Sequence, residues 1–337
     1  MTYYIIYIIF HIIYDKIIIG DNMIINIVLL IVGFIMLIKG ADILVDGASS
    51  TALNLGMSKI LIGLTIVAFG TSAPELAVSI SARMSGSDDI VIGNVIGSSI
   101  FNTLLILGIS SLIRPIPVKE NTVKKELPMQ LILSVLLVVV MLDITLDGSL
   151  INLITRSDAL AITLFFSIFV YYLVAMAKKE LFHDKAPYGI FKSLLFVIVG
   201  LVALIYGSNL VVNNSINIAK VIGISDRIIG LTIIALGTSL PELITSITSS
   251  LKGEDDLLVG NIIGSNIFNI CIVLGLPVAI FGTIKASGFT MFDLIMFILS
   301  ALILYIVAKT KKQIGKKEGI IMILMFIAYY TIIFFIK

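Results

Sequence analysis

Two glutamates lie inside strongly apolar segments, and each belongs to a sequence that occurs twice in the chain. Residues 63–82 (GLTIVAFGTSAPELAVSISA) and 230–249 (GLTIIALGTSLPELITSITS) are identical at 13 of 20 positions, with an offset of 167 residues. Glu75 therefore corresponds to Glu242. A carboxylate inside a membrane is costly and usually marks a functional site. A duplicated one predicts a cation site shared between two halves of a transporter.

Each glutamate ends a helix-breaking sequence, GTSAPE at 70–75 and GTSLPE at 237–242. A proline inside a helix removes one hydrogen bond and displaces the carbonyl four residues earlier, which for Pro74 belongs to Gly70. Each break thus offers free carbonyls, two hydroxyls and one carboxylate. This all-oxygen set favours Ca²⁺, Na⁺ or Mg²⁺ over zinc or copper. The alternative is that Pro and Gly only kink two helices and that each glutamate has a structural role.

A second duplicated motif follows each break, and residues 93–108 match 260–275 at 10 of 16 positions. Ser98 and Asn102 are four residues apart, so they share one helix face, and so do Ser265 and Asn269. We expect the oxygens of these four side chains to join the ion site. The alternative is hydrogen bonding between helices.

Charge counting indicates which ions would compete for the site. The two glutamates together carry a charge of −2, which one Ca²⁺ neutralises. Two bidentate carboxylates and one carbonyl from each break give six oxygens, the lower end of the range of about 6–8 that calcium takes. Sodium ions could occupy the same oxygens, and such competition is what exchange requires. Without an ion the two carboxylates would repel each other, so a proton could also serve as counter-ion.

The composition excludes an ordinary soluble domain. Apolar residues make up 59% of the chain, charged residues make up 13%, and the mean hydropathy is +1.15. The net charge of +2 gives no indication of nucleic-acid binding. The single cysteine, Cys271, cannot form an intramolecular disulfide. The apolar spans offer no histidine-rich zinc site, so we expect no enzyme activity and no cofactor, only transported Ca²⁺ and Na⁺ as bound ions.

Apolar runs long enough to cross a bilayer predict an all-α integral membrane protein with ten transmembrane helices. We expect these near residues 24–45, 59–82, 90–113, 128–147, 157–177, 190–212, 228–250, 257–281, 289–308 and 318–336. The offset of 167 divides them into two five-helix repeats, residues 23–189 with a cytoplasmic linker and residues 190–337. Because five is odd, the second repeat must enter the membrane from the opposite side, so the repeats are inverted.

The distribution of basic residues orients the chain in this scheme. Fifteen lysines and arginines fall in the loops on the side of the linker between spans five and six, and five fall on the other side. The positive-inside rule places the more basic side in the cytoplasm. Residues 1–22 have no counterpart in the second repeat. Three alternatives stay open for them: an eleventh span, an interfacial segment, or a start misassigned upstream of Met23. We interpret them as an apolar extension that is dispensable.

At the GTSAPE/GNVIGSSIFN and GTSLPE/GNIIGSNIFN motifs the chain resembles the cation/calcium antiporter superfamily, close to the prokaryotic sodium/calcium exchangers. The motifs correspond to the two alpha-repeats of that family, and the resemblance extends over residues 23–337. It implies that the two glutamates coordinate calcium. It also implies that the threonine carbonyls bind calcium and that the Thr and Ser hydroxyls assist sodium, at Thr71, Ser72, Thr238 and Ser239.

The resemblance further implies that the carbonyls of Ala68 and Ala235 line sodium sites, and it matches Ser98 and Ser265 to serines of the family's third and eighth spans. One position departs from the pattern. Some close relatives have Asp where this chain has Asn269, with Asn at the position of Asn102. Asparagine in both copies leaves two ionisable groups at the centre, so ion selectivity and stoichiometry stay open.

We therefore expect a plasma-membrane antiporter that exchanges Na⁺ for Ca²⁺ and that functions as a monomer in the lipid bilayer. The family implies alternating access, with the first and sixth helices sliding across the others. Two alternatives stay open: a proton/calcium or broader cation antiporter, and a cation channel. In a channel the filter usually forms at the axis of an oligomer, whereas here one chain supplies both halves of the site.

Overall fold

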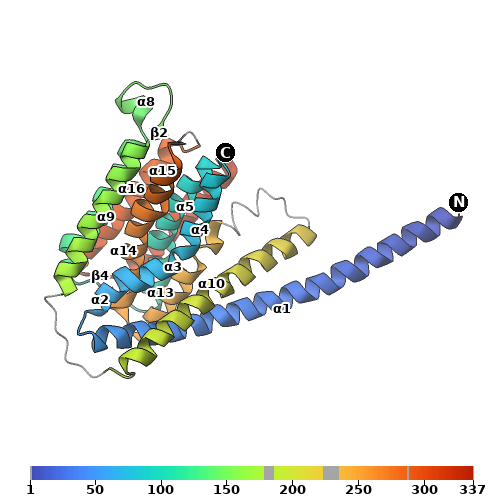
Figure 1. The fold of residues 1–337 in the computed structure, drawn as a ribbon, viewed down its shortest axis with the longest axis horizontal. Coiled ribbons are helices and arrows are strands. Elements are labelled where there is room, and N and C mark those ends of the chain that lie inside the picture. Colours follow the sequence, from blue (N-terminus) through green and yellow to red (C-terminus); the bar gives the residue numbers. More distant parts are fainter. Residues whose placement is uncertain (1, 178–185, 223–234, 287, 337) are drawn as a thin grey trace.

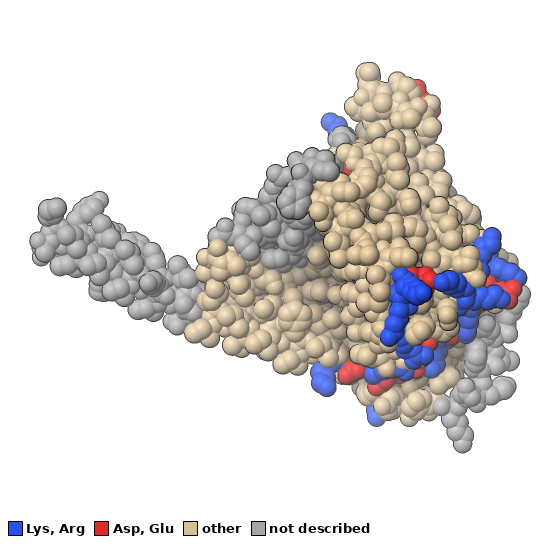
Figure 2. Space-filling view, turned by 180° about the vertical axis from the view of Figure 1, so that it is seen from behind, with Lys and Arg blue, Asp and Glu red and all other residues tan. Residues whose placement is uncertain are grey.

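The computed structural model describes the backbone of residues 2–177, 186–222, 235–286 and 288–336, and the side chains of residues 23–177, 186–222, 236–286 and 288–333. Within these ranges nearly every element is helical (Figure 1). Most of the surface seen in Figure 2 is uncharged, and charged side chains gather toward one end of the molecule. Such a surface suits a helical protein surrounded by lipid.

The first half of the chain forms helices joined by short turns. The letter η denotes a π-helical turn, in which each hydrogen bond spans five residues. The elements in order are α1 (Thr2–Asn54), α2 (Lys59–Ile62), η1 (Gly63–Val67), α3 (Ala68–Thr71), α4 (Ala73–Met84), α5 (Asp88–Ile100), η2 (Phe101–Ile106), α6 (Leu107–Ile113), β1 (Ile116–Pro117), η3 (Thr122–Glu126), α7 (Leu127–Val140), α8 (Asp143–Leu146), β2 (Leu153–Ile154) and α9 (Arg156–Ala177).

The second half has the same order of long helices. Its elements are α10 (Ile190–Val221), α12 (Ala235–Gly237), α13 (Leu240–Lys252), α14 (Asp255–Phe268), η5 (Asn269–Leu274), α15 (Gly275–Phe281), β3 (Ile284–Lys285), α16 (Met291–Lys311), β4 (Gln313–Ile314) and α17 (Lys316–Ile336).

Six helical stretches in the described part are long and apolar enough to cross a membrane. They are Met23–Asn54, Asp88–Ile113, Arg156–Ala177, Ile190–Val221, Asp255–Phe281 and Met291–Lys311. A seventh candidate is the bent pair Lys59–Thr71 and Ala73–Met84, whose halves meet at 43°. The chain is therefore a multi-pass membrane protein.

The bend occurs where the sequence predicts a break. Ser72 separates α3 from α4 with φ −84° and ψ 8°, and Pro74 lies in the first turn of α4. Ser239 has nearly the same conformation, φ −87° and ψ 9°, in front of α13 and Pro241. Proline is tolerated in a first helical turn because its missing N–H would have no partner there. The duplicated sequence thus produces the same local structure twice.

The helices α1 and α10 form an intimate pair that crosses the remaining bundle obliquely (Figure 1). Glycines make this close approach possible. A Cβ on Gly200 would lie 2.7 Å from the backbone nitrogen of Leu44, and one on Gly40 would lie 3.1 Å from the carbonyl oxygen of Gly200. One hydrophobic core lies between these two helices, and a larger one fills the bundle around α5 and α14.

The expected span at 128–147 is displaced in the structure. The helix begins with η3, ends at Val140, and is followed by the separate short helix α8. The Asp143 carboxylate accepts the backbone N–H of Leu153 at 2.8 Å, which folds this segment back on itself. At the other end the helix begins earlier than expected, at Thr122, and the exposed Lys124 in this first turn pairs with Glu120.

Residues 2–22 continue α1 without a break, so this helix has 53 residues. Its length is about 80 Å, far more than the roughly 30 Å of a hydrocarbon core. Its N-terminal end projects away from the other helices (Figure 1). Whether the extension is dispensable stays a prediction.

Candidate cation site

The two carboxylates occupy equivalent positions in the first turns of α4 and α13. Glu75 and Glu242 are each 0% exposed. Each follows its break by three residues, so the proline before it and the first-turn geometry direct its side chain into the bundle.

Hydrogen bonds connect each carboxylate to the break of the other copy. Ser72 Oγ donates to Glu242 Oε1 at 2.9 Å, and Ser239 Oγ donates to Glu75 Oε1 at 3.0 Å. Ser98 lies 3.1 Å from Ser239, between their hydroxyl oxygens. The carboxylates that are 167 residues apart in sequence therefore belong to one buried cluster.

Several buried polar atoms of this cluster have no hydrogen-bond partner among the described residues. These atoms are Oε2 of both glutamates, Oδ1 of Asn102, and both Oδ1 and Nδ2 of Asn269. A buried polar atom without a partner costs about 1–3 kcal/mol. Four of these five atoms are oxygens, the ligands that hard cations such as Ca²⁺ and Na⁺ prefer.

The charge of the cluster is also uncompensated. Within the described part of the chain, no ion pair involves Glu75 or Glu242. In that part, no three or more His, Cys, Asp and Glu side chains are arranged so that they could hold a metal ion by themselves. The site thus combines two carboxylates with neutral oxygens. Two buried charges without a counter-charge are strongly unfavourable, so the cluster fits a cation better than it fits a purely structural role.

In the first copy, the Thr71 side chain and the Ala68 carbonyl form hydrogen bonds with side chains of the second copy. Thr71 Oγ1 donates to Asn261 Oδ1 at 3.1 Å and to the Ala68 carbonyl at 3.3 Å. Ser265 Oγ lies 3.4 Å from the same carbonyl and 3.5 Å from Glu242 Oε1. The Ala68 carbonyl also accepts the backbone N–H of Ser72 at 3.1 Å, so its oxygen is occupied by hydrogen bonds in this structure.

Their counterparts in the second copy are Thr238 and Ala235, for which fewer hydrogen bonds are seen among the described residues. Thr238 lies beside the carboxyl of Glu75, and its hydroxyl makes no hydrogen bond of standard geometry with a described residue. Ala235 is the first residue of α12. The Gly237 carbonyl accepts a hydrogen bond from Ser208 Oγ of α10 at 2.8 Å. The assignment of these residues as cation ligands stays a prediction.

Comparison with known proteins agrees with this geometry. Residues 25–175 and 192–335 match the family model described as sodium/calcium exchanger protein. The chain belongs to the sodium/calcium exchanger protein family. It is 38% identical over 305 residues to a putative antiporter, CaxA, of Alkalimonas amylolytica, covering 85% of this chain and 91% of the relative.

Two further matches include an exchanger of known structure. The sodium/calcium exchanger MaX1 of Methanosarcina acetivorans is 31% identical over 324 residues, which cover 86% of this chain and 92% of MaX1. A structure of the sodium-calcium exchanger NCX_Mj superposes with a TM-score of 0.80 at 30% identity, over 94% of this chain and 100% of that chain. As a member of this family the chain is a membrane transporter and not an enzyme.

Sequence reasoning missed two asparagines that position the breaks of this exchanger-family protein. Asn94 Nδ2 donates to the Glu75 carbonyl at 2.8 Å and to Ser79 Oγ at 2.9 Å. Its counterpart Asn261 accepts from Thr71 and donates to Ser246 Oγ at 3.3 Å. Both residues occupy the second position of the duplicated GN motif, so their repetition at the offset of 167 could have identified them.

The π-helical turns were also not foreseen. Asn102 lies in η2, and Asn269 begins η5. A π-turn inserts an extra residue into the helix and often marks a functional site. It changes the direction in which the next side chains point, and periodicity in the sequence does not reveal it.

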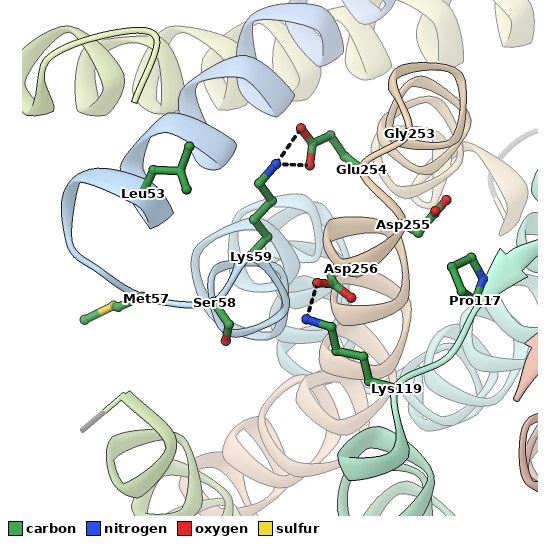
Figure 3. Close-up of a pocket in the computed structure, with 10 residues that line it drawn as sticks. All are labelled: Leu53, Met57, Ser58, Lys59, Pro117, Lys119, Gly253, Glu254, Asp255 and Asp256. Carbon is green, nitrogen blue, oxygen red and sulfur yellow. Dashed lines mark hydrogen bonds and ion pairs between the residues drawn. The ribbon is translucent and has the colours of Figure 1, made fainter. Parts of the chain in front are cut away.

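A second polar region, away from the carboxylate pair, is internally neutralised. It is a cavity of about 350 Å³ between the α1–α2 turn and the α13–α14 turn (Figure 3). Lys59 Nζ lies 2.7 Å from Glu254 Oε2, and Lys119 Nζ lies 2.6 Å from Asp256 Oδ2. Arg114 pairs with Asp255 at 3.0 Å. Because each carboxylate there has a basic partner, this cavity lacks the uncompensated charge found at Glu75 and Glu242.

Proposed function

We propose that this chain is a secondary antiporter that exchanges Na⁺ for Ca²⁺ across the cell membrane by alternating access. The cations bind between two inverted five-helix repeats, residues 23–189 and 190–337, in a fold of ten transmembrane helices. Each chain carries a complete pair of carboxylates, so one molecule suffices for transport. Residues 1–22 are dispensable for it.

One observation carries this proposal: Glu75 and Glu242 are fully buried, bonded across the repeats by serines, and without a basic partner in the described structure. A charge of −2 in such a place is balanced by one Ca²⁺ or by two singly charged ions. Because both loadings use the same oxygens, they exclude each other. The site opens alternately to the two sides of the membrane. Because Ca²⁺ and Na⁺ cannot occupy it together, the protein exchanges one ion for the other and does not let either pass uncoupled.

Two short β ladders support the inverted arrangement. The ladder β1·β4 joins the segment after α6 to the segment before α17, and β2·β3 joins the segment before α9 to the segment after α15. In the two halves of the chain, β1 corresponds to β3 and β2 corresponds to β4. Exchanging the halves therefore converts the ladder β1·β4 into the ladder β2·β3. They lie toward opposite ends of the bundle (Figure 1), as a two-fold axis in the membrane plane would require.

The counter-ion can be determined by calcium uptake into proteoliposomes with imposed gradients. We expect uptake when Na⁺ runs down its gradient and no uptake in a double variant, Glu75→Gln with Glu242→Gln. The matched control is Glu318→Gln, a carboxylate that pairs with Lys311 near the start of α17. This control removes a negative charge outside the site and should transport like the wild type.

The runner-up is a proton/calcium antiporter, because the two buried carboxylates repel each other when no cation is bound and one of them then tends to take up a proton. Calcium uptake that is driven by a pH gradient and is independent of the sodium gradient would show that the counter-ion is H⁺ and not Na⁺. Calcium flux without any coupled ion would overturn antiport and indicate a channel. A truncation lacking residues 1–22 that inserts normally and fails to transport would contradict the proposed dispensability of that segment.

A further inference from the structure

The beginning of η3 and the end of α16 enclose a basic cavity that has no role in the carboxylate site. Its volume is about 360 Å³, and its lining is Glu120, Val123, Lys124, Tyr305, Lys309 and Lys312. Three lysines and one glutamate leave a net charge of +2. On the face seen in Figure 2, basic side chains gather in one region beside a few acidic ones, while most of the remaining surface is uncharged.

The single glutamate does not neutralise the three lysines. Glu120 lies 2.5 Å from Lys124 Nζ and 3.7 Å from Lys312 Nζ. The hydrogen bond from Lys124, followed by the charges of Lys124 and Lys312, lowers the pKa of Glu120, so this carboxylate is already ionised and shared. The Lys309 ammonium lies 5.5 Å from the centre of the Tyr305 ring and makes no ion pair with a described residue. A second anion is therefore favourable here.

The backbone holds the cavity in place. The β1·β4 ladder pairs Ile116 with Ile314, and the N–H of Val118 donates to the Lys312 carbonyl at 2.9 Å. Among the described residues, Lys312 is the only non-glycine residue with a positive φ, 53°. Glycine is the usual residue at this place after a helix, because a side chain there is strained. Lys312 nevertheless occupies this position, and its side chain lines the cavity.

Apolar surface continues from the cavity along both helices toward the middle of the membrane. On α16, Leu302 and Ile306 are 37% and 48% exposed, and on α7, Ile132 and Val135 are 54% and 40% exposed. Tyr305, one helical turn before Lys309, also lines the cavity, and aromatic rings concentrate at membrane interfaces. A small soluble anion would use only the lysines, whereas a phospholipid would use both the lysines and the apolar surface.

We infer that this cavity binds the phosphate headgroup of an anionic phospholipid, with Lys124, Lys309 and Lys312 around the headgroup and the acyl chains against α7 and α16. The inference rests on the proposed topology, which places this end of the molecule at the cytoplasmic face. Basic pockets between helices on that face suit anionic lipids, whose surface potential attracts each lysine. The lipid would fix the ends of two helices that belong to different repeats.

Lipid binding can be measured directly, without transport, by native mass spectrometry of the purified protein. Phosphatidylglycerol is titrated against phosphatidylcholine with the same acyl chains. We expect the wild type to retain phosphatidylglycerol preferentially. In the double variant Lys309→Gln with Lys312→Gln we expect binding about 25-fold weaker, at about fivefold for each lysine. The control is Lys316→Gln with Lys317→Gln, two exposed lysines of the next segment that remove the same charge outside the cavity, and it should bind within about twofold of the wild type.

A third variant separates a binding role from a structural one. Lys312→Gly keeps the positive φ without strain, so we expect it to unfold at the same or a higher temperature while it loses phosphatidylglycerol. Equal retention of both lipids by the wild type would overturn the inference, and so would equal losses in the two double variants. Displacement of the lipid by millimolar glycerol phosphate alone would show a phosphate site and overturn the lipid assignment. A failure of antiport with intact lipid retention would concern only the proposed function.

Discussion

The two copies of the ion-site motif have nearly the same sequence but different hydrogen bonding around their asparagines. In the first copy, Asn102 Nδ2 donates to Asn266 Oδ1 at 3.1 Å, which leaves only Oδ1 of Asn102 without a partner. In the second copy, neither Oδ1 nor Nδ2 of Asn269 has a partner in the described structure. One asparagine is therefore fixed with its oxygen available, whereas the other can rotate.

A single substitution between the copies explains this difference. Asn266 occupies the position that Ser99 has in the first copy. The longer Asn266 reaches across to Asn102 and also donates to Thr103 Oγ1 at 2.9 Å. The Ser99 hydroxyl has no hydrogen-bond partner among the described residues, although α5 packs against η5. A pair of near-identical motifs can thus supply one rigid and one adjustable ligand.

The largest expected effect concerns the feature that the copies share. Glu75→Gln and Glu242→Gln each remove one of the two charges that balance Ca²⁺, and each carboxylate makes the same single serine bond across the repeats. Calcium affinity, measured by calorimetry in detergent, should fall at least about 100-fold in both variants, beyond the 10–100-fold typical for residues that only support a metal ligand. A large loss in one variant with a small loss in the other would show that the carboxylates are not equivalent.

The paired helices α1 and α10 give a second test of equivalence, with a smaller expected effect. Gly40 and Gly207 are related by the offset of 167, and a Cβ on either would approach its neighbours to 2.9 Å. Gly40→Ala and Gly207→Ala should each cost about 1–3 kcal/mol of stability by overpacking and should slow transport to a similar degree. The control is Gly97→Ala, because a Cβ there meets no atom within 4 Å. Thermal unfolding that changes in only one of the two variants would contradict symmetric packing.

The sequence predicted the features that follow from local chemistry and from duplication. Proline after GTS predicted the break at Ser72, and the offset of 167 predicted that Ser239 would match it. It could not predict which oxygens lack partners, because that depends on contacts between helices far apart in the chain. The reach of Asn266 to Asn102, over 164 residues, is such a contact. The π-turn at Asn269 has no local signal either, since it changes the helix by one residue without altering its apolar character.

Removing the difference between the copies should have a moderate effect. Asn266→Ser gives the second copy the serine that the first copy has at Ser99. The substitution removes the hydrogen bonds of Asn266 to Asn102 and to Thr103, each worth about 1 kcal/mol, so the Asn102 side chain is no longer fixed. The KM for calcium in proteoliposomes should rise about fivefold, while kcat changes less. Ser99→Ala is the matched control, because the Ser99 hydroxyl makes no hydrogen bond with a described residue. An unchanged KM in Asn266→Ser would show that the fixation of Asn102 does not matter for binding.

The smallest expected effect comes from the converse change, Ser99→Asn, which offers Asn269 the kind of partner that Asn102 already has. Fixing one rotatable amide restores at most about 0.5–1 kcal/mol of ordering entropy, so calcium affinity should rise by about two- to fivefold. The same change should slow turnover, because an adjustable ligand helps the site alternate between one divalent and two monovalent ions. Paired measurements of calcium binding and of sodium-driven uptake can separate the two effects. Tighter binding with faster turnover would show that the mobility of Asn269 is not used, and the difference between the copies would then concern packing alone.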